Sequence, residues 1–458
     1  MTNSMRALIV FLIMAILLAI VGFYQSWNLS LQILNFCIIS AIMSLGVNIQ
    51  WGYAGLLNIG VMGFAALGGL AAMIVATPPV PGAWALGWYG LLSTAIVLVA
   101  VVGSIIFAYR FIGNGRSKTL SIMAIAVVGY FLIRAVFDPA VELIEGFEPH
   151  HAGFLGGFGL PIILSWAFGG LLAAAAAWLI GKIALGLRAD YLAIATLGIS
   201  EIVIAILKNE DWLTRGVKNV SGLPRPVPYE VDLQVSDTFH GVIEWIFSGR
   251  LAAAADEAAR SEMMRLLLIE YSSIFVKLCY AGLFGTVLII LFLLSERALN
   301  SPWGRMMRAI RDNETSAEAM GKDVKGRHLE VFIIGAVVVG IAGAMMTTID
   351  GQLTPTAYQP LRFTFLIWVM VIVGGSGNNL GAIIGGFIIW FFWIEAEPIG
   401  LWVMDQVTFF LEDGSALKES LIGNAAHMRL FMMGMILLLV MRFSPKGLIP
   451  ERIAKSTD

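Results

Sequence analysis

The chain alternates between long apolar runs and short polar segments. A run of about 20 apolar residues is long enough to cross a bilayer as a helix. Such runs, with a few shorter ones toward the end, span residues 7–23, 31–49, 54–76, 91–112, 119–137, 161–181, 190–207, 273–294, 329–349, 363–375, 380–395 and 429–443. This pattern predicts an all-α polytopic membrane protein with about 10–12 membrane segments, which form a single transmembrane domain over residues 1–458.

Composition supports this fold class. Of 458 residues, 59% are hydrophobic and 13% are charged, whereas about 25% of the residues in soluble domains are charged. The first apolar run follows Arg6 and could be mistaken for a secretory signal. However, Gln25-Ser26-Trp27 is a poor small-residue cleavage site. The run is therefore expected to remain as the first membrane helix.

The basic residues predict the orientation in the membrane. Seventeen Lys and Arg residues fall in segments on one side, and the short segments on the other side carry two, Arg362 and Lys418. Basic loops stay in the cytoplasm, so both termini and the loop 295–328 are predicted to be cytoplasmic. Residues 208–272 then form a long outer insert. Its seven basic residues do not oppose this, because long loops translocate largely regardless of charge.

Two glycine-dense stretches, 51–64 and 374–386, interrupt the helical pattern. Such glycines either let helices approach closely or break helices that border a translocation path. The second stretch separates the runs 363–375 and 380–395, which as helices would cover only about 20–24 Å of a roughly 30 Å core. We therefore expect broken helices there, arranged as a re-entrant hairpin or a tilted pair.

The loop 295–328 carries seven basic and five acidic residues between two apolar runs. It is either a solvated loop held inside by its charge or an element that docks a partner. Pro302 suits the first turn of a helix and Gly321 its end, so one helix is predicted from Trp303 to Met320. The docking candidates are Trp303, Gly304, Arg305, Arg308, Arg311, Asp312, Glu314, Glu318 and Gly321.

The outer insert contains a helix-forming stretch from Ala252 to Leu268, after a proline-rich beginning. We expect an amphipathic helix that lies on the outer surface. An interaction surface is the other interpretation, and the sequence does not separate the two.

Motifs for catalysis and cofactor binding are missing from the sequence. No G-x-x-x-x-G-K-[ST] phosphate loop occurs, and the nearest stretch, Gly113–Thr119, lacks the glycine before the lysine. The five histidines form no metal-ligand pattern, and Cys37 and Cys279 lie in apolar runs. We expect no enzymatic activity, no metal and no cofactor in this chain.

Glu201 and Arg134 are ionisable residues within apolar runs. Charges there are costly and face the bundle interior or water. Glu201 either lines a path or pairs with Arg134 at a similar depth. We expect the pairing, because an unpaired carboxylate at this depth would favour its neutral form.

Several sequence blocks carry a family resemblance. They are Asn48–Phe64, Leu187–Ile202 (LRADYLAIATLGISEI), Ser221-Gly222-Leu223, Gly304–Gly321, Val373–Gly381 (VGGSGNNLG) and Arg442–Pro450 (RFSPKGLIP). Together they resemble the membrane permease subunits of branched-chain amino-acid ABC importers. Two blocks depart from the family pattern: Ala189 replaces a glycine, and Arg215 replaces a glycine before Gly216. The insert through Ser272 is also longer than expected, which puts the binding-protein partner or its substrate in doubt.

The resemblance implies a permease of the bacterial inner membrane that moves branched-chain or related amino acids inward by alternating access. It implies as partners two cytoplasmic ATPase subunits that bind the ATP, a second permease subunit, a periplasmic substrate-binding protein and the lipid bilayer, but no nucleic acid. The segment 303–321 would be the helix that couples to an ATPase. Translocation-path candidates are Asn48, Gly52, Gly55, Asn58, Gly60, Thr196, Glu201, Gly374, Gly375 and Gly377.

Three other functions stay open at this point, of which a channel is weakened by the absence of an acidic or basic ring in the sequence. An ion-coupled secondary transporter also has glycine-broken helices, but it needs intramembrane acids, and Glu201 is the only well-placed one. An ABC permease for urea or short amides would share the same architecture, since binding proteins commonly set the solute in such systems.

The predicted orientation is testable by thiol labelling. Single cysteines at Ser236 in the insert and Ser415 near the last run should react with an impermeant thiol reagent in intact spheroplasts, because both positions are predicted to lie outside. A cysteine at Ser316 should be protected. Labelling of the cysteine at Ser316, with protection of those at Ser236 and Ser415, would show that the orientation is the opposite of the predicted one.

Overall fold

The computed structural model describes residues 3–113, 115–148, 153–253, 256–409, 415–424 and 427–451. Nine helices in this part of the chain are long and apolar enough to cross a membrane. They are α1 (Asn3–Tyr24), α2 (Trp27–Ala54), α4 (Pro81–Phe111), α5 (Arg116–Glu145), α6 (Ile163–Ala184), α7 (Ala189–Asn209), α12 (Glu257–Leu299), α15 (Val324–Asp350) and α17 (Asn379–Val407). Two shorter apolar helices are α3 (Val61–Ala76) and α16 (Pro360–Gly374). The predicted all-α polytopic membrane protein is confirmed.

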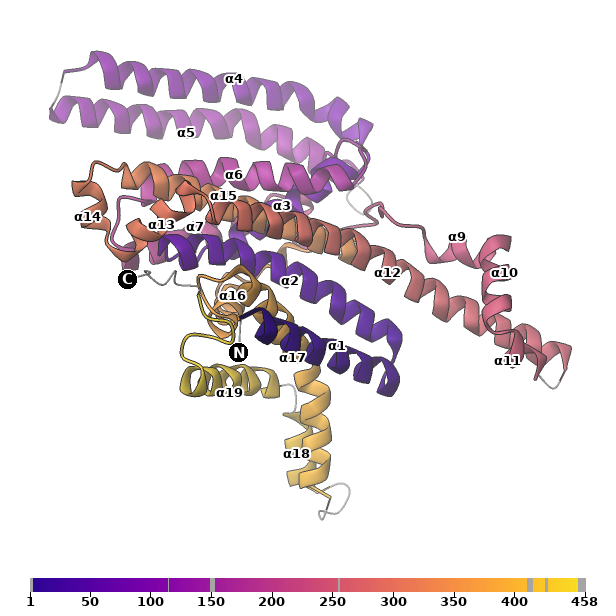
Figure 1. Ribbon diagram of the computed structural model, residues 1–458. Helices are drawn as coiled ribbons and strands as arrows, with labels where there is room; N and C mark the ends of the chain where they lie inside the picture. Colours follow the sequence, from indigo (N-terminus) through magenta and orange to yellow (C-terminus); the bar gives the residue numbers. More distant parts are fainter. Residues whose placement is uncertain are drawn as a thin grey trace, which may run out of the picture.

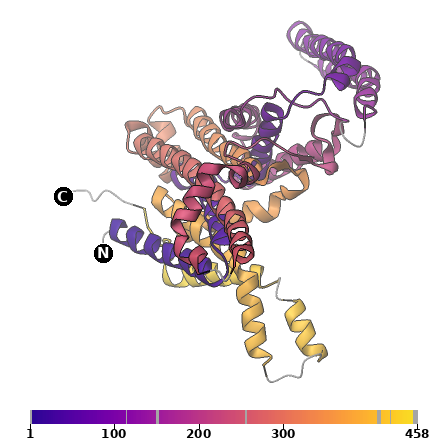
Figure 2. The same cartoon turned by 90° about the vertical axis from the view of Figure 1, so that its right-hand side faces the viewer.

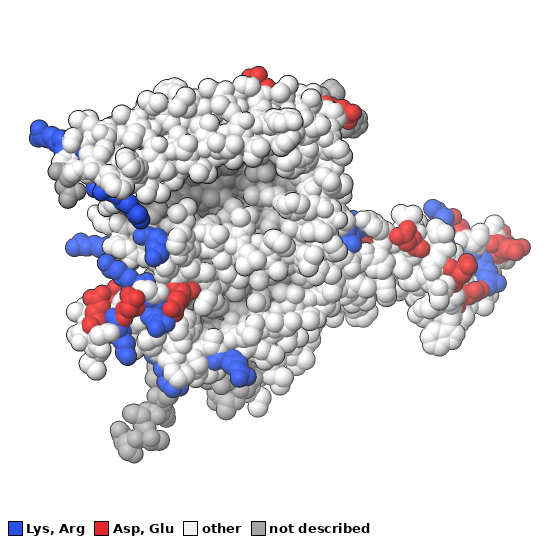
Figure 3. All heavy atoms as spheres, turned by 90° about the horizontal axis from the view of Figure 1, so that it is seen from above, with Lys and Arg blue, Asp and Glu red and all other residues white. Residues whose placement is uncertain are grey.

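The charged surface separates into two ends. Figure 3 shows acidic and basic side chains gathered at one end and on a projection at the other, while the surface between them is almost free of charge. The first end carries α13 (Pro302–Asp312) and α14 (Glu314–Ala319), and the projection carries α9 (Glu230–Val235), α10 (Asp237–Ile246) and α11 (Ser248–Ala252). An uncharged band between two charged ends is what a bilayer requires of the helices that cross it.

Close backbone packing builds the core around α15, which lies against α2, α3 and α6. A Cβ atom at Gly46 of α2 would lie 2.9 Å from the carbonyl oxygen of Gly335, and one at Gly68 of α3 would overlap that of Gly340. Small residues allow this approach, on which helix association in membranes depends.

The helices α4 and α5 form a hairpin that stands apart from this core. Figures 1 and 2 both show the pair outside the remaining helices. One end of the hairpin is attached to the body through buried Ala83, Ile144 and Leu155, against which Trp212 of the short helix α8 (Asp211–Thr214) packs. The rest of the hairpin presents apolar side chains to its surroundings.

The insert, residues 208–272, differs from the sequence-based expectation. The stretch 252–268 does not lie on a surface as a separate helix. Most of it is the beginning of α12, whose 43 residues would measure about 65 Å and extend beyond the body (Figure 1). The Asp256 side chain caps the helix by accepting from the Ala259 amide at 2.7 Å, and no glycine or proline breaks it before the membrane span, so the helix continues into it.

The small helices α9–α11 fold back on this extension. Ile243 and Leu251 pack against Leu267 and Leu268 in a cluster separate from the main core. Near the body, the insert passes the 3-10 helix η1 (Gly216–Lys218) and pairs through β1 (Val220–Ser221) with β2 (Gln352–Leu353) in an antiparallel ladder. The insert is thereby tied to the loop that follows α15, just before the 3-10 helix η2 (Pro355–Ala357).

Both glycine-dense stretches interrupt helices at the end that carries α13. Residues 55–60 separate α2 from α3, and residues 375–378 separate α16 from α17. The run 380–395 proves to be part of a longer helix, because α17 continues through Pro398 to Val407. Only α16, at 15 residues, is as short as expected. Beyond α17, α18 (Ala416–Gly423) projects from the body (Figure 2), and α19 (Met428–Phe443) packs on α16 and α17.

Gly375 is predicted to be essential for this turn. Its φ is +116°, and a Cβ atom would overlap the carbonyl oxygen of Ile449. Gly375→Ala should therefore destabilise the protein by about 1–3 kcal/mol through backbone strain and displacement of the C-terminal segment. Thermal unfolding of the purified protein in detergent should show a lower Tm.

The matched control is Gly285→Ala in α12, where an added Cβ meets no atom within 4 Å. That variant should keep or slightly raise the Tm, because alanine is the better helix former. An unchanged Tm for Gly375→Ala would show that residues 447–450 do not pack against this turn.

Candidate coupling and translocation sites

The predicted docking helix is two helices rather than one. Asn313 interrupts it with an extended backbone (φ −157°, ψ 95°), and its side chain accepts from the Ser316 amide at 2.9 Å. Asparagine competes for backbone hydrogen bonds in this way and so favours the N-cap of a new helix. The end at Gly321 is as expected, with a left-handed φ of +77°.

One face of α13 is buried against the membrane helices. Gly304, Met307 and Ile310, spaced three residues apart, are its buried residues. A Cβ atom at Gly304 would overlap the carbonyl oxygen of Leu299, so glycine allows α13 to turn tightly from the end of α12. The helix is thus part of the body and not a free loop.

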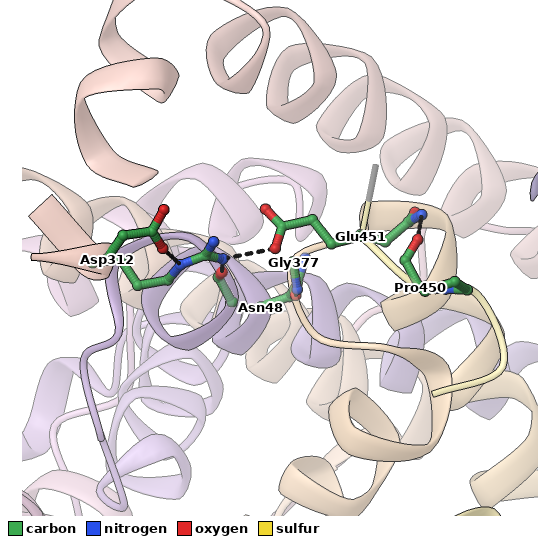
Figure 4. A network of polar contacts seen from close by, with 8 residues as sticks. Asn48, Asp312, Gly377, Pro450 and Glu451 are labelled. Atoms are coloured by element: carbon green, nitrogen blue, oxygen red, sulfur yellow. Dashed lines mark hydrogen bonds and ion pairs between the residues drawn. The ribbon is translucent and has the colours of Figure 1, made fainter. Parts of the chain in front are cut away.

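The arginines of α13 bond inward, toward the body. Arg308 donates to the carbonyl oxygen of Leu299 at 3.2 Å. Arg311 donates to the carbonyl oxygen of Gly52 and forms ion pairs of 3.1 Å with Glu451 and with Asp312 (Figure 4). These two arginines hold α13 in place.

The charge of Arg311 is secured by its neighbours. Burial by itself lowers the pKa of Arg311, but the hydrogen bonds and charges of Glu451 and Asp312 outweigh burial and raise it. A partly buried charge needs such partners, because its hydration is lost. The guanidinium therefore stays charged and joins α13, the end of α2 and the C-terminal segment.

A second layer of hydrogen bonds joins the last turns of α2 to the break between α16 and α17. The buried side chain of Asn48 accepts from the Gly377 amide at 2.9 Å and donates to Asn379 at 3.0 Å. Asn379 in turn donates to Glu296 of α12 at 3.0 Å. A Cβ atom at Gly52 would overlap both Asn48 and Gly377, so these backbones meet only because glycine is there.

The C-terminal segment completes the network. The amides of Leu448 and Ile449 donate at 2.9 Å to the carbonyl oxygens of Val373 and Gly374, and the Asn378 side chain donates to Pro450 at 3.1 Å (Figure 4). These bonds hold the following residue, Glu451, beside Arg311. Glu451, Asn379 and Glu296 are not among the site residues expected from the sequence. An acidic residue directly after the Arg442–Pro450 block was the available signal for Glu451.

Asn58, Gly60 and Thr196 form a separate group that stabilises the break between α2 and α3. Asn58 donates to Gln50 at 2.8 Å and accepts from the Gly60 amide at 2.9 Å. Thr196 of α7 accepts from the Ile59 amide at 3.1 Å. Gly55 ends α2 with a left-handed φ of 71°. These residues therefore satisfy the polar groups of an irregular backbone within the protein, as burial of that backbone requires.

The expected pair between Glu201 and Arg134 is wrong. Arg134 bonds to Asp138 at 2.9 Å, one turn away on its own helix. That pair needs no contact between helices, whereas the α4–α5 hairpin stands apart from the core. Glu201 is exposed on α7 and lines a cleft of about 920 Å³ beside residues of α16, α17 and α19.

No cluster of three or more His, Cys, Asp or Glu side chains suited to a metal ion occurs among the described residues. Cys37 and Cys279 are free thiols within α2 and α12. The two polar sites of interest are therefore the network around Arg311 and the cleft beside Glu201.

Comparison with known proteins shows which protein family this chain resembles. The family described as "Branched-chain amino acid transport system / permease component" matches residues 121–441. The high-affinity branched-chain amino acid transport system permease protein LivM of Escherichia coli K12 is 25% identical over 372 residues, covering 80% of this chain and 72% of LivM. LivM of Salmonella typhimurium is 24% identical over 369 residues, with the same coverage of both chains.

A more distant relative is a permease for a sugar. The xylose transport system permease protein XylH of Escherichia coli K12 is 26% identical over 182 residues, 37% of this chain and 45% of XylH. No solved structure matches. The family match extends over well more than half of the chain, and the protein therefore belongs to the branched-chain amino-acid transport system permease components.

Proposed function

We propose that this permease component imports branched-chain or related amino acids by alternating access, driven by two cytoplasmic ATPase subunits and paired with a second permease subunit. A periplasmic binding protein would deliver the solute. One observation supports coupling most directly: α13 is fastened to the membrane body on one side by Arg311 and its partners, while α14 and the outer side of α13 are exposed.

The exposed side of this pair has the composition of a docking surface. Arg305, Glu314 and Glu318 offer charges to solvent, and Met320 is 80% exposed at the end of α14. A protruding apolar side chain within a polar surround is a common anchor at protein interfaces. Arg308 and Arg311 remain docking candidates from the sequence, and their bonds to Leu299, Gly52 and Glu451 are the ties that hold α13 to the body.

The ties give a route for motion. A shift of α13 would act on the end of α2 through Gly52, and on the C-terminal segment through Glu451. That segment is bonded to the end of α16. Packed helices transmit such a shift between discrete arrangements, because close-packed interiors deform little.

The docking surface is tested by the double variant Glu318→Arg with Met320→Asp. It should insert in the membrane at normal levels but recover at least about tenfold less ATPase on co-purification, because a contact with reversed charge and a buried carboxylate loses affinity. ATP-driven uptake in proteoliposomes should fall with it.

The control for this test is Glu257→Arg, an exposed site at the opposite end of α12, which should leave ATPase recovery unchanged. Full recovery of the ATPases by the double variant would remove α14 from the contact.

The bonds by which Arg311 ties α13 to the body are tested separately by Arg311→Ala. Hydrogen bonds to a charged group contribute about 1.5–3 kcal/mol each, and this variant loses those to Gly52 and Glu451 while the exposed side remains. We expect ATPase recovery to persist while ATP-driven uptake drops at least about tenfold. Arg442→Ala, at an exposed arginine of α19, should keep both activities. Normal uptake by Arg311→Ala would show that the tie does not transmit motion.

A further inference from the structure

A cleft of about 920 Å³ opens between α7, α16, α17 and α19. Glu201, Lys208, Arg362 and Arg429 contribute charges to its lining, and apolar side chains such as Phe365 and Met433 form much of the rest. Clefts of roughly 300–1,000 Å³ with apolar walls and a few convergent polar groups are typical of small-molecule sites. The cleft lies away from the Arg311 network, near the first residues of α16 and α19.

The carboxylate of Glu201 is free in this cleft. Its side chain is exposed on a membrane-spanning helix, about 18 Å from the beginning of α7, and no described residue bonds to it. A charged group at such a position is costly against lipid, and it normally faces water or the interior of an assembly. The wall that bears Glu201 is therefore suited to a hydrated route or to a ligand.

The cations of the cleft also have unused donors. The Arg362 guanidinium is stacked 4.8 Å from the ring centroid of Trp393, which leaves its hydrogen-bond donors free of the described residues. The guanidinium of Arg429 forms an ion pair with Glu397, but the Nε atom of Arg429 is buried without a partner among the described residues. Stacking holds an arginine in orientation while its planar donors remain available for a carboxylate.

These groups match the chemistry of an amino-acid zwitterion. An arginine pairs in bidentate fashion with a carboxylate, and a free carboxylate pairs with an ammonium group. The apolar side chains Phe365, Leu366 and Met433 offer a surface to an aliphatic side chain. A sugar or urea carries no charge and would leave both Glu201 and Arg362 unpaired, at the cost of desolvating them.

We infer that this cleft is a solute site of the permease, where Arg362 and Arg429 bind the α-carboxylate and Glu201 binds the α-ammonium of an aliphatic amino acid. The inference rests on the proposed import function and specifies its solute class. It assigns Glu201 to solute binding, in place of the structural pair expected from the sequence.

The test uses leucine and two analogues that each lack one charged group: 4-methylpentanoate without the ammonium and 3-methylbutylamine without the carboxylate. Equilibrium dialysis of radiolabelled leucine against the purified transporter complex, with the analogues as competitors, gives the three affinities. The unaltered complex should prefer leucine to both analogues by about tenfold or more, because each charged pair adds to the affinity.

Each variant should lose one preference and keep the other. Glu201→Gln should bind leucine about tenfold more weakly and no longer discriminate against 4-methylpentanoate, yet still disfavour 3-methylbutylamine. Arg362→Gln should show the opposite pattern. Because the readout is a ratio of affinities within one preparation, partial loss of folded protein does not imitate it. Glu270→Gln, an exposed carboxylate on the extension of α12, should change neither ratio.

Unchanged leucine affinity and selectivity in both variants would overturn the assignment of the cleft, and so would an unaltered complex that binds no leucine. ATP-driven leucine uptake by the unaltered complex tests the proposed function independently. If the unaltered complex takes up leucine and both variants keep full selectivity for leucine over the analogues, the cleft is rejected as the solute site and the proposed import function stands. Absence of uptake rejects the function on which the inference rests.

Discussion

The contact between the last turns of α2 and the break that follows α16 is the constraint on which the rest of this structure depends. The Gly377 amide donates to the buried Asn48 side chain, and Gly52 lies so close that any Cβ atom would overlap both. A buried backbone that leaves its helix must find hydrogen-bond partners within the protein, because water does not reach it. The asparagine supplies one partner, and the glycine supplies the space.

The same meeting point determines where α13 and the C-terminal segment lie. The carbonyl oxygen of Gly52 accepts from Arg311, and the turn at Gly375 leaves room for the backbone of Ile449. Glu451, two residues later, then reaches Arg311. Three segments far apart in the chain are held at one end of the bundle by bonds to the last turns of α2 and to the end of α16.

The short helix α16 connects this end with the cleft. It begins beside Arg362 and ends at Gly374, where the Ile449 amide bonds to it. Its 15 residues span about 22 Å, so a change at the α13 end and a change at the cleft would act on the two ends of one rigid element. This arrangement would link the proposed ATPase docking to the proposed solute binding.

The sequence by itself determined the fold class, the approximate number of spans, the helix start at Pro302 and the helix end at Gly321. These features follow from local properties: the length of apolar runs, and the backbone preferences of proline and glycine. The tertiary structure decided the partners of charged groups. Arg311 and Gly52 are separated by 259 positions, and no local pattern indicates that they bond. The tertiary structure also showed that Arg134 pairs within its own helix and that Glu201 faces a cleft. An ion pair between helices depends on which helices pack together, and the hydropathy of the sequence does not predict that packing.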